Sequence, residues 1–574
     1  MAQFEIKDGV AIIPEGTTEI TAWTFKGCTS LKSITIPNSA TEIGDWAFSG
    51  CTSLKSITIP DSVTSIGREA FSRCTSLKSI KIPESVTEIG YQAFDGCTSL
   101  ESITIPESVT EIGKSAFNGC TSLKSVTIPE SVTKIGYQAF NGCTSLESIV
   151  VADGNPVYDS REGCNAIIET TTNTLIQGCK TTVIPESVTK IAGYAFNGCT
   201  SLESIVVADG NPVYDSREGC NAIIETTTNT LIQGCKTTVI PESVTKIGEY
   251  AFDGCTSLEN ITIHESVTVI GKYAFSSCTS LKNITIPESV TTIGGGAFSG
   301  CTSLESIIIP ESVTNIGYNA FDGCTSLKSI SIPESVTNIE RGTFKGCTSL
   351  ESITIPESVT TIGGGAFSGC TSLESITIPE SVTNIGYNAF SGCTLLKSIS
   401  IPNSVTEIGE KAFNGCTSLE SITIPELVTN IGDYAFYGCT SLKSITIPEG
   451  VTEIGACAFS YCTWLKSITI PKSVTEIRVG TFYGCTSLES VVIPKGVRKI
   501  EERAFADCTS LTTLTLPIGV NKIEEQVFDK CSALAAINVP AGKADYYKKR
   551  LPEELHDKIV ELAPEKKTKT EKEC

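Results

Sequence analysis

Cysteine is the residue type that first suggests chemistry in this chain. The sequence has 26 Cys in 574 residues, and twenty of them, such as Cys51 and Cys74, occupy one position of a repeated pattern. Zinc sites need short paired spacings, and the close pair Cys457 and Cys462 has no second pair at a matching spacing. We therefore expect no metal and no cofactor, and we interpret the recurring cysteines as small hydrophobic side chains that face inward.

The sequence offers few residues for acid–base or nucleophilic catalysis. Its two histidines, His264 and His556, are far apart in the chain, and neither stands beside a nucleophile and an orienting carboxylate. The glycine runs at 293–298 and 362–367 lack the Gly-Lys-Ser/Thr that contacts phosphate and metal in phosphate loops. The sequence therefore predicts a protein that is not an enzyme.

Charge and composition argue against several kinds of partner. A net charge of -21 disfavours nucleic acids and anionic membrane surfaces, because binding to them requires clustered Lys and Arg. With 40% hydrophobic and 19% charged residues, the composition is that of a folded soluble protein. No stretch approaches the roughly 18 apolar residues of a membrane span, and the first residues lack the basic and apolar regions of a signal peptide. We expect neither nucleic-acid binding nor membrane insertion.

The elements that would position these residues follow a strict internal period. An Ile-Pro landmark or its equivalent recurs every 23 residues from Pro14 to Ala152 and from His264 to Pro540, and two steps of 33 residues interrupt the period between these stretches. Repeats of this length are typical of solenoids. The landmarks predict one stack of about 23 rungs rather than several globular domains.

Each rung is predicted to contribute one short strand. The alternation Leu-x-x-Ile-x-Ile at 54–59 is that of a strand with one buried face, and Pro60 ends it because proline cannot donate to a ladder. Gly67 is interpreted as a permissive corner, and Ala70 and Phe71 as part of a short helical turn that leads back to the axis. Because one rung cannot bury its own apolar residues, the rungs are expected to stack at about 4.8 Å.

The repeat resembles that of the BspA-like leucine-rich repeat family, Ile-Gly-x-x-Ala-Phe-x-x-Cys-x-x-Leu-x-x-Ile-x-Ile-Pro. Equivalents recur from about residue 10 to residue 540. The resemblance implies a curved leucine-rich-repeat solenoid, mainly β with short helical turns, with a parallel sheet on its concave face. It also implies adhesion to host proteins or other cells, usually from the bacterial surface. One matching rung contains Ile112, Gly113, Ala116, Phe117, Cys120, Leu123, Val126, Ile128 and Pro129.

The ends and the two long rungs break the period. Residues 143–191 and 199–247 are identical over 49 positions, which indicates a tandem duplication of a unit with one long rung. The extra length is predicted to project as a hairpin, and two helical segments, ending at Leu562, are predicted to close the C-terminal end. The predicted parts are a capping rung at 1–14, the solenoid at 15–540 with hairpin insertions near 153–183 and 209–239, a helical cap at 541–562 and a disordered tail at 563–574.

The hairpins could contain disulfides. A turn centred on Thr171 and Thr172 would place Ile167 opposite Ile176. Directly paired residues are close enough for a disulfide, although free thiols remain the alternative. The candidate pairs are Cys164 with Cys179 and, in the second copy, Cys220 with Cys235.

Two exposed surfaces are candidates for binding. On the concave sheet, the residues between the buried ones form Ser and Thr columns, which are also simply good strand residues. The second surface is the variable pair that precedes Ala-Phe, where exposed positions would vary without any function but where Tyr and Trp favour binding hot spots. The strand candidates are Ser33, Thr35, Ser56, Thr58, Ser79, Lys81, Ser102, Thr104 and Thr127. The variable-pair candidates are Trp46, Tyr91, Tyr137, Tyr194, Tyr250, Tyr273, Tyr318, Tyr387 and Tyr434.

These features predict a protein that binds a protein or glycan partner by many weak contacts along the solenoid, strengthened by multivalency. The family resemblance favours the cell surface. The missing signal peptide and the many thiols favour the alternative, an intracellular scaffold. A third hypothesis is that the regular hydroxyl columns order a repetitive solid such as ice or a polysaccharide.

Overall fold

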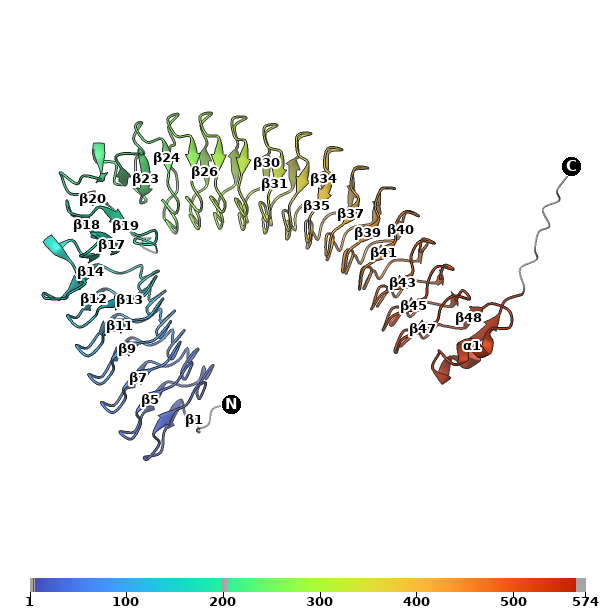
Figure 1. The fold of residues 1–574 in the computed structure, drawn as a ribbon, viewed down its shortest axis with the longest axis horizontal. Coiled ribbons are helices and arrows are strands. Elements are labelled where there is room, and N and C mark those ends of the chain that lie inside the picture. The colour runs from blue at the N-terminus through green and yellow to red at the C-terminus, as the bar shows by residue number, and fades with distance from the viewer. Residues whose placement is uncertain (1–3, 5, 198–201, 203, 564–574) are drawn as a thin grey trace. The chain divides into compact units, whose positions relative to one another are not determined.

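The computed structural model describes residue 4, residues 6–197, residue 202 and residues 204–563 (Figure 1). The chain divides into two units, Met1–Leu281 and Lys282–Cys574. Each unit is a stack of rungs, and most regular rungs contribute a strand of three or four residues followed by a two-residue strand. The solenoid of stacked rungs predicted from the period is thereby confirmed, and so is the leucine-rich-repeat architecture that the family resemblance implies.

The N-terminal unit begins with two stacks of parallel strands. Its first sheet contains β1 (Ile6–Lys7), β2 (Val10–Ile12), β4 (Ser33–Thr35), β6 (Ser56–Thr58), β8 (Ser79–Lys81), β10 (Ser102–Thr104), β12 (Ser125–Ile128) and β14 (Ser148–Val151). Its second sheet contains β3 (Glu19–Ile20), β5 (Glu42–Ile43), β7 (Ser65–Ile66), β9 (Glu88–Ile89), β11 (Glu111–Ile112) and β13 (Lys134–Ile135). Among the described strands of these two sheets, β1 alone pairs antiparallel, with β2, so that a hairpin covers the first rung.

The rest of this unit contains the two long rungs. The first copy has β15 (Tyr158–Asp159), a 3-10 helix at Arg161–Gly163, β16 (Ile167–Glu169), β17 (Thr174–Gln177), β18 (Val183–Ile184) and β19 (Lys190–Ile191). The second has β20 (Val206–Val207), β21 (Tyr214–Asp215), a 3-10 helix at Arg217–Gly219, β22 (Ile223–Glu225), β23 (Thr230–Gln233) and β24 (Lys246–Ile247). The regular rung that follows contributes β25 (Val269–Ile270).

The C-terminal unit repeats the regular pattern to its end. Its longer strands are β26 (Asn283–Thr285), β28 (Ser306–Ile308), β30 (Ser329–Ser331), β32 (Ser352–Thr354), β34 (Ser375–Thr377), β36 (Ser398–Ser400), β38 (Ser421–Thr423), β40 (Ser444–Thr446), β42 (Ser467–Ile468), β44 (Ser490–Val492), β46 (Thr513–Thr515) and β48 (Ala536–Val539). Its shorter strands are β27 (Thr292–Ile293), β29 (Asn315–Ile316), β31 (Asn338–Ile339), β33 (Thr361–Ile362), β35 (Asn384–Ile385), β37 (Glu407–Ile408), β39 (Asn430–Ile431), β41 (Glu453–Ile454), β43 (Glu476–Ile477), β45 (Lys499–Ile500) and β47 (Lys522–Ile523).

Identical residues of successive rungs stack on one another inside each unit. The rings of Phe48 and Phe71 lie 5.2 Å apart and nearly parallel, and those of Phe367 and Phe390 lie 5.4 Å apart. The recurring cysteines face this core, as predicted. Their thiols donate hydrogen bonds to main-chain carbonyl groups; for example, Cys74 Sγ donates to Phe48 O at 3.2 Å. The same contact recurs along both units, so the column also satisfies buried carbonyl groups.

The glycine predicted to permit the corner is needed for a steric reason. Gly67 and Gly136 do not have the positive φ that favours glycine. A Cβ on Gly67 would lie 2.7 Å from Asp45 N of the preceding rung, and one on Gly136 would lie 2.3 Å from Lys114 N. These glycines therefore permit the corner because they let neighbouring rungs approach closely, and not because they adopt a left-handed backbone conformation.

The segment between this glycine and the recurring cysteine forms a series of turns and not a continuous helix. The Cys74 N–H bonds to Phe71 O at 3.1 Å within the rung, whereas the Phe71 N–H bonds to Ala93 O of the next rung at 2.8 Å. The residue before Ala often has a positive φ, for example 54° at Trp46 and 60° at Tyr250. Interrung bonding therefore fixes a backbone that a short helix could not adopt.

The predicted hairpin is present in each long rung, but its apolar residues do not project. In the first copy, β16 pairs antiparallel with β17, and Ile168 is opposite Leu175 in the predicted register. A bulge then places Ile167 opposite Gln177 instead of Ile176. Ile167, Ile168 and Leu175 are fully buried, because the hairpin continues the stack of shorter strands by pairing with β19.

The C-terminal cap contains helix α1 (Ala544–Lys548) and a 3-10 helix at Glu553–Lys558, followed by β49 (Ile559–Glu561). The second predicted helical segment is therefore helical only in its first part. Residues of β49 pair in parallel with β48, Ile559 opposite Ile537, which satisfies the otherwise open edge of that strand. Residues 564–574 of the predicted tail lie outside the described residues.

Candidate functional site

The exposed residues of the longer strands form regular ladders. In the N-terminal unit, Ser33 is paired with Ser56 and Thr35 with Thr58, and Lys81 continues the Thr column. The predicted strand residues all lie on this outer side, which we call the strand face; Ser33 is half-buried and the other eight are exposed. The structure thus brings these residues into register across neighbouring rungs.

Hydroxyl groups of the strand face differ from those elsewhere on a rung. Ser108 Oγ donates to Val86 O at 2.6 Å, and Thr110 Oγ1 donates to Thr87 O at 3.3 Å, so both groups tie one rung to the previous one. Among the described residues, the hydroxyl groups of the predicted strand-face residues make no hydrogen bond to the protein. The strand face therefore presents hydroxyl groups that remain available to a ligand.

The variable-pair residues lie on the turns, which we call the turn edge, and several contact one another. Trp46 stacks on Trp23 with ring centroids 5.6 Å apart. The Arg68 guanidinium lies 5.3 Å from the centroid of the Trp46 ring and 4.5 Å from that of the Tyr91 ring, within range of cation–π attraction. These rings stabilise the turns by contacts between rungs.

A second run of turn-edge aromatics crosses the long rungs. Tyr137, Tyr194, Tyr250 and Tyr273 form successive ring pairs with centroids 4.9 to 5.1 Å apart. The Tyr194 hydroxyl donates to the Tyr250 hydroxyl at 3.0 Å, and burial together with this bond raises the pKa of the Tyr250 phenol. These tyrosines therefore contribute to packing between rungs, which leaves less of each ring available to a ligand.

The remaining predicted tyrosines are placed differently. Tyr318 and Tyr387 are 41% and 47% exposed. The ring of Tyr318 lies so close to Gly295 that a Cβ there would be 2.7 Å from the nearest ring atom. A Cβ on Gly364 would likewise lie 2.5 Å from the ring of Tyr387. The two Gly-Gly-Gly runs thus accommodate a tyrosine of the next rung. Tyr434 is covered by the Lys411 ammonium, 5.4 Å from the centroid of its ring.

The four cysteines of the hairpins are free thiols in the structure. Cys179 packs in one hydrophobic cluster with Ile167, whereas Cys164 packs in another with Ile168, so the two side chains face different parts of the core. The Cys179 thiol donates to Asn165 O at 3.3 Å. Burial raises the pKa of Cys164 to about 11 and raises that of Cys220, which keeps these thiols neutral and poorly reactive. In the second copy, Cys235 likewise donates to Asn221 O.

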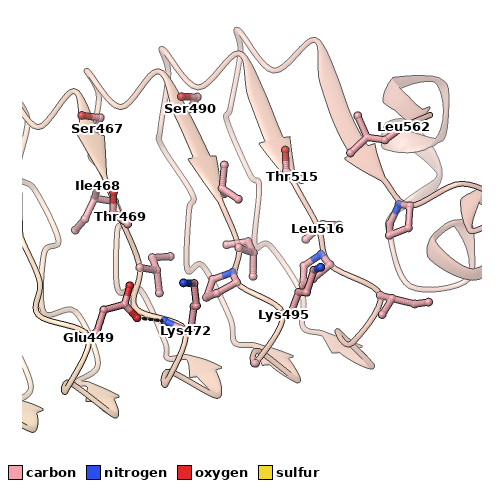
Figure 2. Close-up of a pocket in the computed structure, with 18 of the residues that line it drawn as sticks. Glu449, Ser467, Ile468, Thr469, Lys472, Ser490, Lys495, Thr515, Leu516 and Leu562 are labelled. Carbon is pink, nitrogen blue, oxygen red and sulfur yellow. Dashed lines mark hydrogen bonds between the residues drawn. The ribbon is translucent and has the colours of Figure 1, made fainter. Parts of the chain in front are cut away.

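A groove that the sequence analysis did not anticipate lies at the end of the C-terminal unit (Figure 2). It has a volume of about 1130 Å³ and is formed by the exposed side of β42, β44 and β46 together with the residues that follow each strand. Ser467 and Ser490 lie at the rim where the strands begin, and Lys472 and Lys495 lie toward the rim where they end (Figure 2). Leu562, which follows β49, closes the C-terminal end.

The groove coincides with a change in one repeat column. The residue after the landmark proline is acidic in most rungs of the C-terminal unit, from Glu288 to Glu449, but becomes Lys472, Lys495 and then Ile518. On the strand face, Val492 replaces the usual Thr. Val492 and Ile518 are 65% and 60% exposed. Alignment of the rungs would have shown these departures, but only the structure shows that they surround one groove.

Within the described ranges, no three His, Cys, Asp or Glu side chains lie together in a way that could hold a metal ion. None of the helices in the described part of the chain is long and apolar enough to cross a membrane.

The fold and the exposed ladders together define a leucine-rich-repeat solenoid. The family model described as BspA type leucine rich repeat region matches the chain in six copies, over residues 10–97, 47–161, 169–217, 229–351, 337–466 and 429–549. The chain therefore belongs to the BspA-type leucine-rich repeat family, as the repeat motif predicted.

Solved structures of bacterial repeat proteins are similar to this chain. A leucine-rich repeat protein from Bacteroides ovatus is 27% identical, with 79% of this chain and 88% of that one covered and a TM-score of 0.46. A leucine rich cell surface protein from Faecalibacterium prausnitzii is 30% identical, with 61% and 88% covered and a TM-score of 0.36. No curated protein sequence matches the chain.

Proposed function

We propose that this chain is a non-enzymatic adhesion or interaction protein that binds a protein or glycan partner through the strand face. The observation that carries the proposal is the ladder of exposed hydroxyl groups, of which Thr35, Thr58 and Thr104 are members, with no hydrogen-bond partner among the described residues. A ligand can pair with such groups without first breaking a bond inside the protein.

Regular spacing adds to this argument. Successive strands lie about 4.8 Å apart, so a ligand that contacts several rungs meets the same group repeatedly. Many weak contacts of this kind combine through multivalency, provided that the ligand can reach them together. Membership of the leucine-rich repeat family, whose members are generally binding proteins, is consistent with this use of the surface.

Thr-to-Val substitution tests the proposal, because valine keeps the shape and removes the hydroxyl. The full chain, fluorescently labelled, would be applied to arrays of purified glycans and of extracellular-matrix proteins. A variant with T35V, T58V, T104V and T127V should lose binding by roughly tenfold or more, since each hydrogen bond contributes about 0.5–1.5 kcal/mol. Val150 occupies this column naturally, so the variant is compatible with the fold.

The matched control makes the same chemical change on the same rungs. The variant T41V, T64V, T110V and T133V removes hydroxyl groups that bond to the preceding rung instead of facing a ligand. It should keep the binding of the unaltered chain. Equal binding by the strand-face variant and the unaltered chain would refute the proposal.

A further inference from the structure

We infer that the N-terminal end of the strand face binds a linear polysaccharide built of uronic acids, through a row of lysines that runs beside the hydroxyl ladder. The inference rests on the proposed interaction function and names the chemical class of its partner. The row consists of Lys32, Lys55 and Lys78, which we call the lysine rim. All three lysines are exposed, and each directly precedes the strand-face serine of its rung.

Backbone hydrogen bonds hold the lysine rim in register from rung to rung. The Lys55 N–H donates to Lys32 O at 3.1 Å, and the Lys78 N–H donates to Lys55 O at 3.4 Å. Successive lysines therefore follow one another at about the strand spacing, roughly 4.8 Å. Lys7 in β1 is exposed and is paired with Val10 of β2, so that a further ammonium group lies at the N-terminal end of the rim.

Ion pairing between rungs does not account for the lysine rim. In the same column of the C-terminal unit, Lys397 forms an ion pair with Glu374 at 2.8 Å, and Lys443 forms one with Glu420 at 2.6 Å. The three rim lysines form no ion pair in the described part of the chain. Like charges side by side on adjacent strands are destabilising. Packing of the rungs therefore gives no reason for three lysines in succession.

The carboxylates nearest to the lysine rim lie at its two ends. Asp8 precedes the first rung, and Glu101 takes the place after Lys78 in the column, and neither forms an ion pair with a described lysine. Asp61, at the other end of the strands, lies six positions after Lys55, roughly 20 Å away at about 3.3 Å per residue. Charges at that distance are screened, because the Debye length is about 8 Å at physiological salt. The rim is therefore locally basic although the chain has a net charge of -21.

A uronic-acid polysaccharide matches both features of this surface. Each of its sugars carries one carboxylate together with free hydroxyl groups. Each rung offers one ammonium group and two hydroxyl groups, as in Lys55, Ser56 and Thr58. Carboxylates pair with ammonium groups, and sugar hydroxyl groups can both donate to and accept from Ser and Thr. A polymer that repeats these groups meets them on successive rungs, so that weak contacts combine.

Other polyanions match the surface less well. From Ser33 to Thr104, the outward residues of the longer strands are Ser, Thr and Lys. An acidic peptide would find no apolar residue there for its other side chains, and a nucleic acid would find no aromatic ring on which its bases could stack. A heavily sulfated glycan keeps few free hydroxyl groups for the ladder. The hydroxyl groups thus favour a carboxylated sugar over a sulfated one.

The probe is a fluorescein-labelled hexasaccharide of galacturonic acid, titrated with the full chain and followed by fluorescence anisotropy. The matched ligand is the same hexasaccharide with every carboxylate methyl-esterified, which keeps the sugar and removes the charge. We expect the acid to bind, the ester to bind at least roughly tenfold more weakly, and salt to weaken the complex with the acid. Equal binding of the acid and the ester would overturn the inference.

Three further probes represent the other classes of occupant. They are a hexaglutamate peptide, a hexathymidylate and a fully sulfated maltohexaose, all labelled in the same way. Each should bind at least roughly tenfold more weakly than hexagalacturonate. Equal or tighter binding of any of them would overturn the assignment of a uronic-acid ligand.

Substitution of the rim lysines tests the residues themselves. K32T with K55T and K78T removes three positive charges. The variant is compatible with the fold, because Thr512 occupies this column naturally and its hydroxyl donates to Glu489 O of the preceding rung at 3.0 Å. It should bind hexagalacturonate roughly tenfold or more weakly than the unaltered chain does. Unchanged binding by this variant would overturn the inference.

The matched control makes the same change in the same column of the C-terminal unit. K328T with K397T and K443T also removes three positive charges but leaves the lysine rim intact. It should bind hexagalacturonate as the unaltered chain does. A loss equal to that of the rim variant would mean that net charge alone governs binding, and it would overturn the inference.

A second copy of this acidic chain is the remaining occupant to be tested, by light scattering. We expect the same mass for the unaltered chain and for the rim variant. A dimer that the rim substitutions dissociate would identify another copy as the occupant and overturn the inference. The array experiment substitutes threonines and includes neutral glycans and proteins. Failure of hexagalacturonate to bind would therefore overturn this inference and leave the proposed adhesion function standing.

Discussion

The strand face of β4 to β12 and the groove over β42 to β49 have the same backbone and different surfaces. Both are parallel ladders in which equivalent residues pair, Ser33 with Ser56 in one and Val492 with Thr515 in the other. The first presents hydroxyl groups with little variation, whereas the second replaces the columns of its rim by Lys and aliphatic residues. Because the inward columns hold the backbone, the outward columns can change without loss of the fold.

Alkaline pH should produce the largest effect, because it acts on the core that both regions share. Burial raises the pKa of Cys97 and of Cys143 from the ordinary 9.0 to about 12. Above pH 9 these thiols ionise in the unfolded chain but stay protonated in the folded one, so stability is full below pH 9 and falls as the pH rises. The expected loss is about 1.4 kcal/mol per thiol for each pH unit.

Urea unfolding at pH 7.5, 9 and 10, followed by circular dichroism, measures this loss. A variant with Cys97→Ala and Cys143→Ala should lose stability less steeply above pH 9 than the unaltered chain. Identical pH dependence of the two proteins would show that the buried thiols do not govern alkaline unfolding.

Removal of one stacked ring should have the next largest effect, and it should be equal in the two regions. Phe71 and Phe482 are both fully buried, each between two neighbouring rings. Phe71→Ala and Phe482→Ala should each lower the free energy of unfolding by about 3–5 kcal/mol. Hydrogen exchange resolved by peptide would report the loss near each site. A much smaller loss at Phe482 would mean that the groove is supported by something other than the common core.

Exchange of outward residues between the regions should have the smallest effect. Thr58→Val and Val492→Thr should each change the free energy of unfolding by no more than about 0.5 kcal/mol, since both side chains are exposed. Urea midpoints of the two variants against the unaltered chain provide the measurement. A loss comparable to that of Phe71→Ala would contradict the separation of inward from outward columns.

Periodicity alone was sufficient for the rungs, the inward columns and the hydroxyl columns of the strand face. The bulge in the hairpin was not predictable, because a count of residues from the turn assumes an unbroken register, and Ile167 pairs one position away from the expected partner. The strand at Ile559–Glu561 was also missed. Its apolar spacing is compatible with a helix, and the unpaired edge of β48 decided the outcome.

The candidate sites, too, could be predicted only in part from the sequence. The sequence identified the turn-edge aromatics, but the structure showed that Trp46, Tyr91 and Tyr250 contact residues of neighbouring rungs. The groove was identified only from the structure. Lys472 and Ile518 are 46 positions apart in the sequence and line one site only because the rungs stack.

By itself, the sequence determined a nearest-neighbour solenoid, because every rung repeats the same apolar residues at the same interval and no single rung can bury them alone. Only the tertiary structure showed how closely neighbouring rungs approach and which of their residues form a common surface. The closeness of adjacent backbones at Gly67, the burial of the hairpins and the groove all depend on distances between residues of different rungs, which no local pattern specifies.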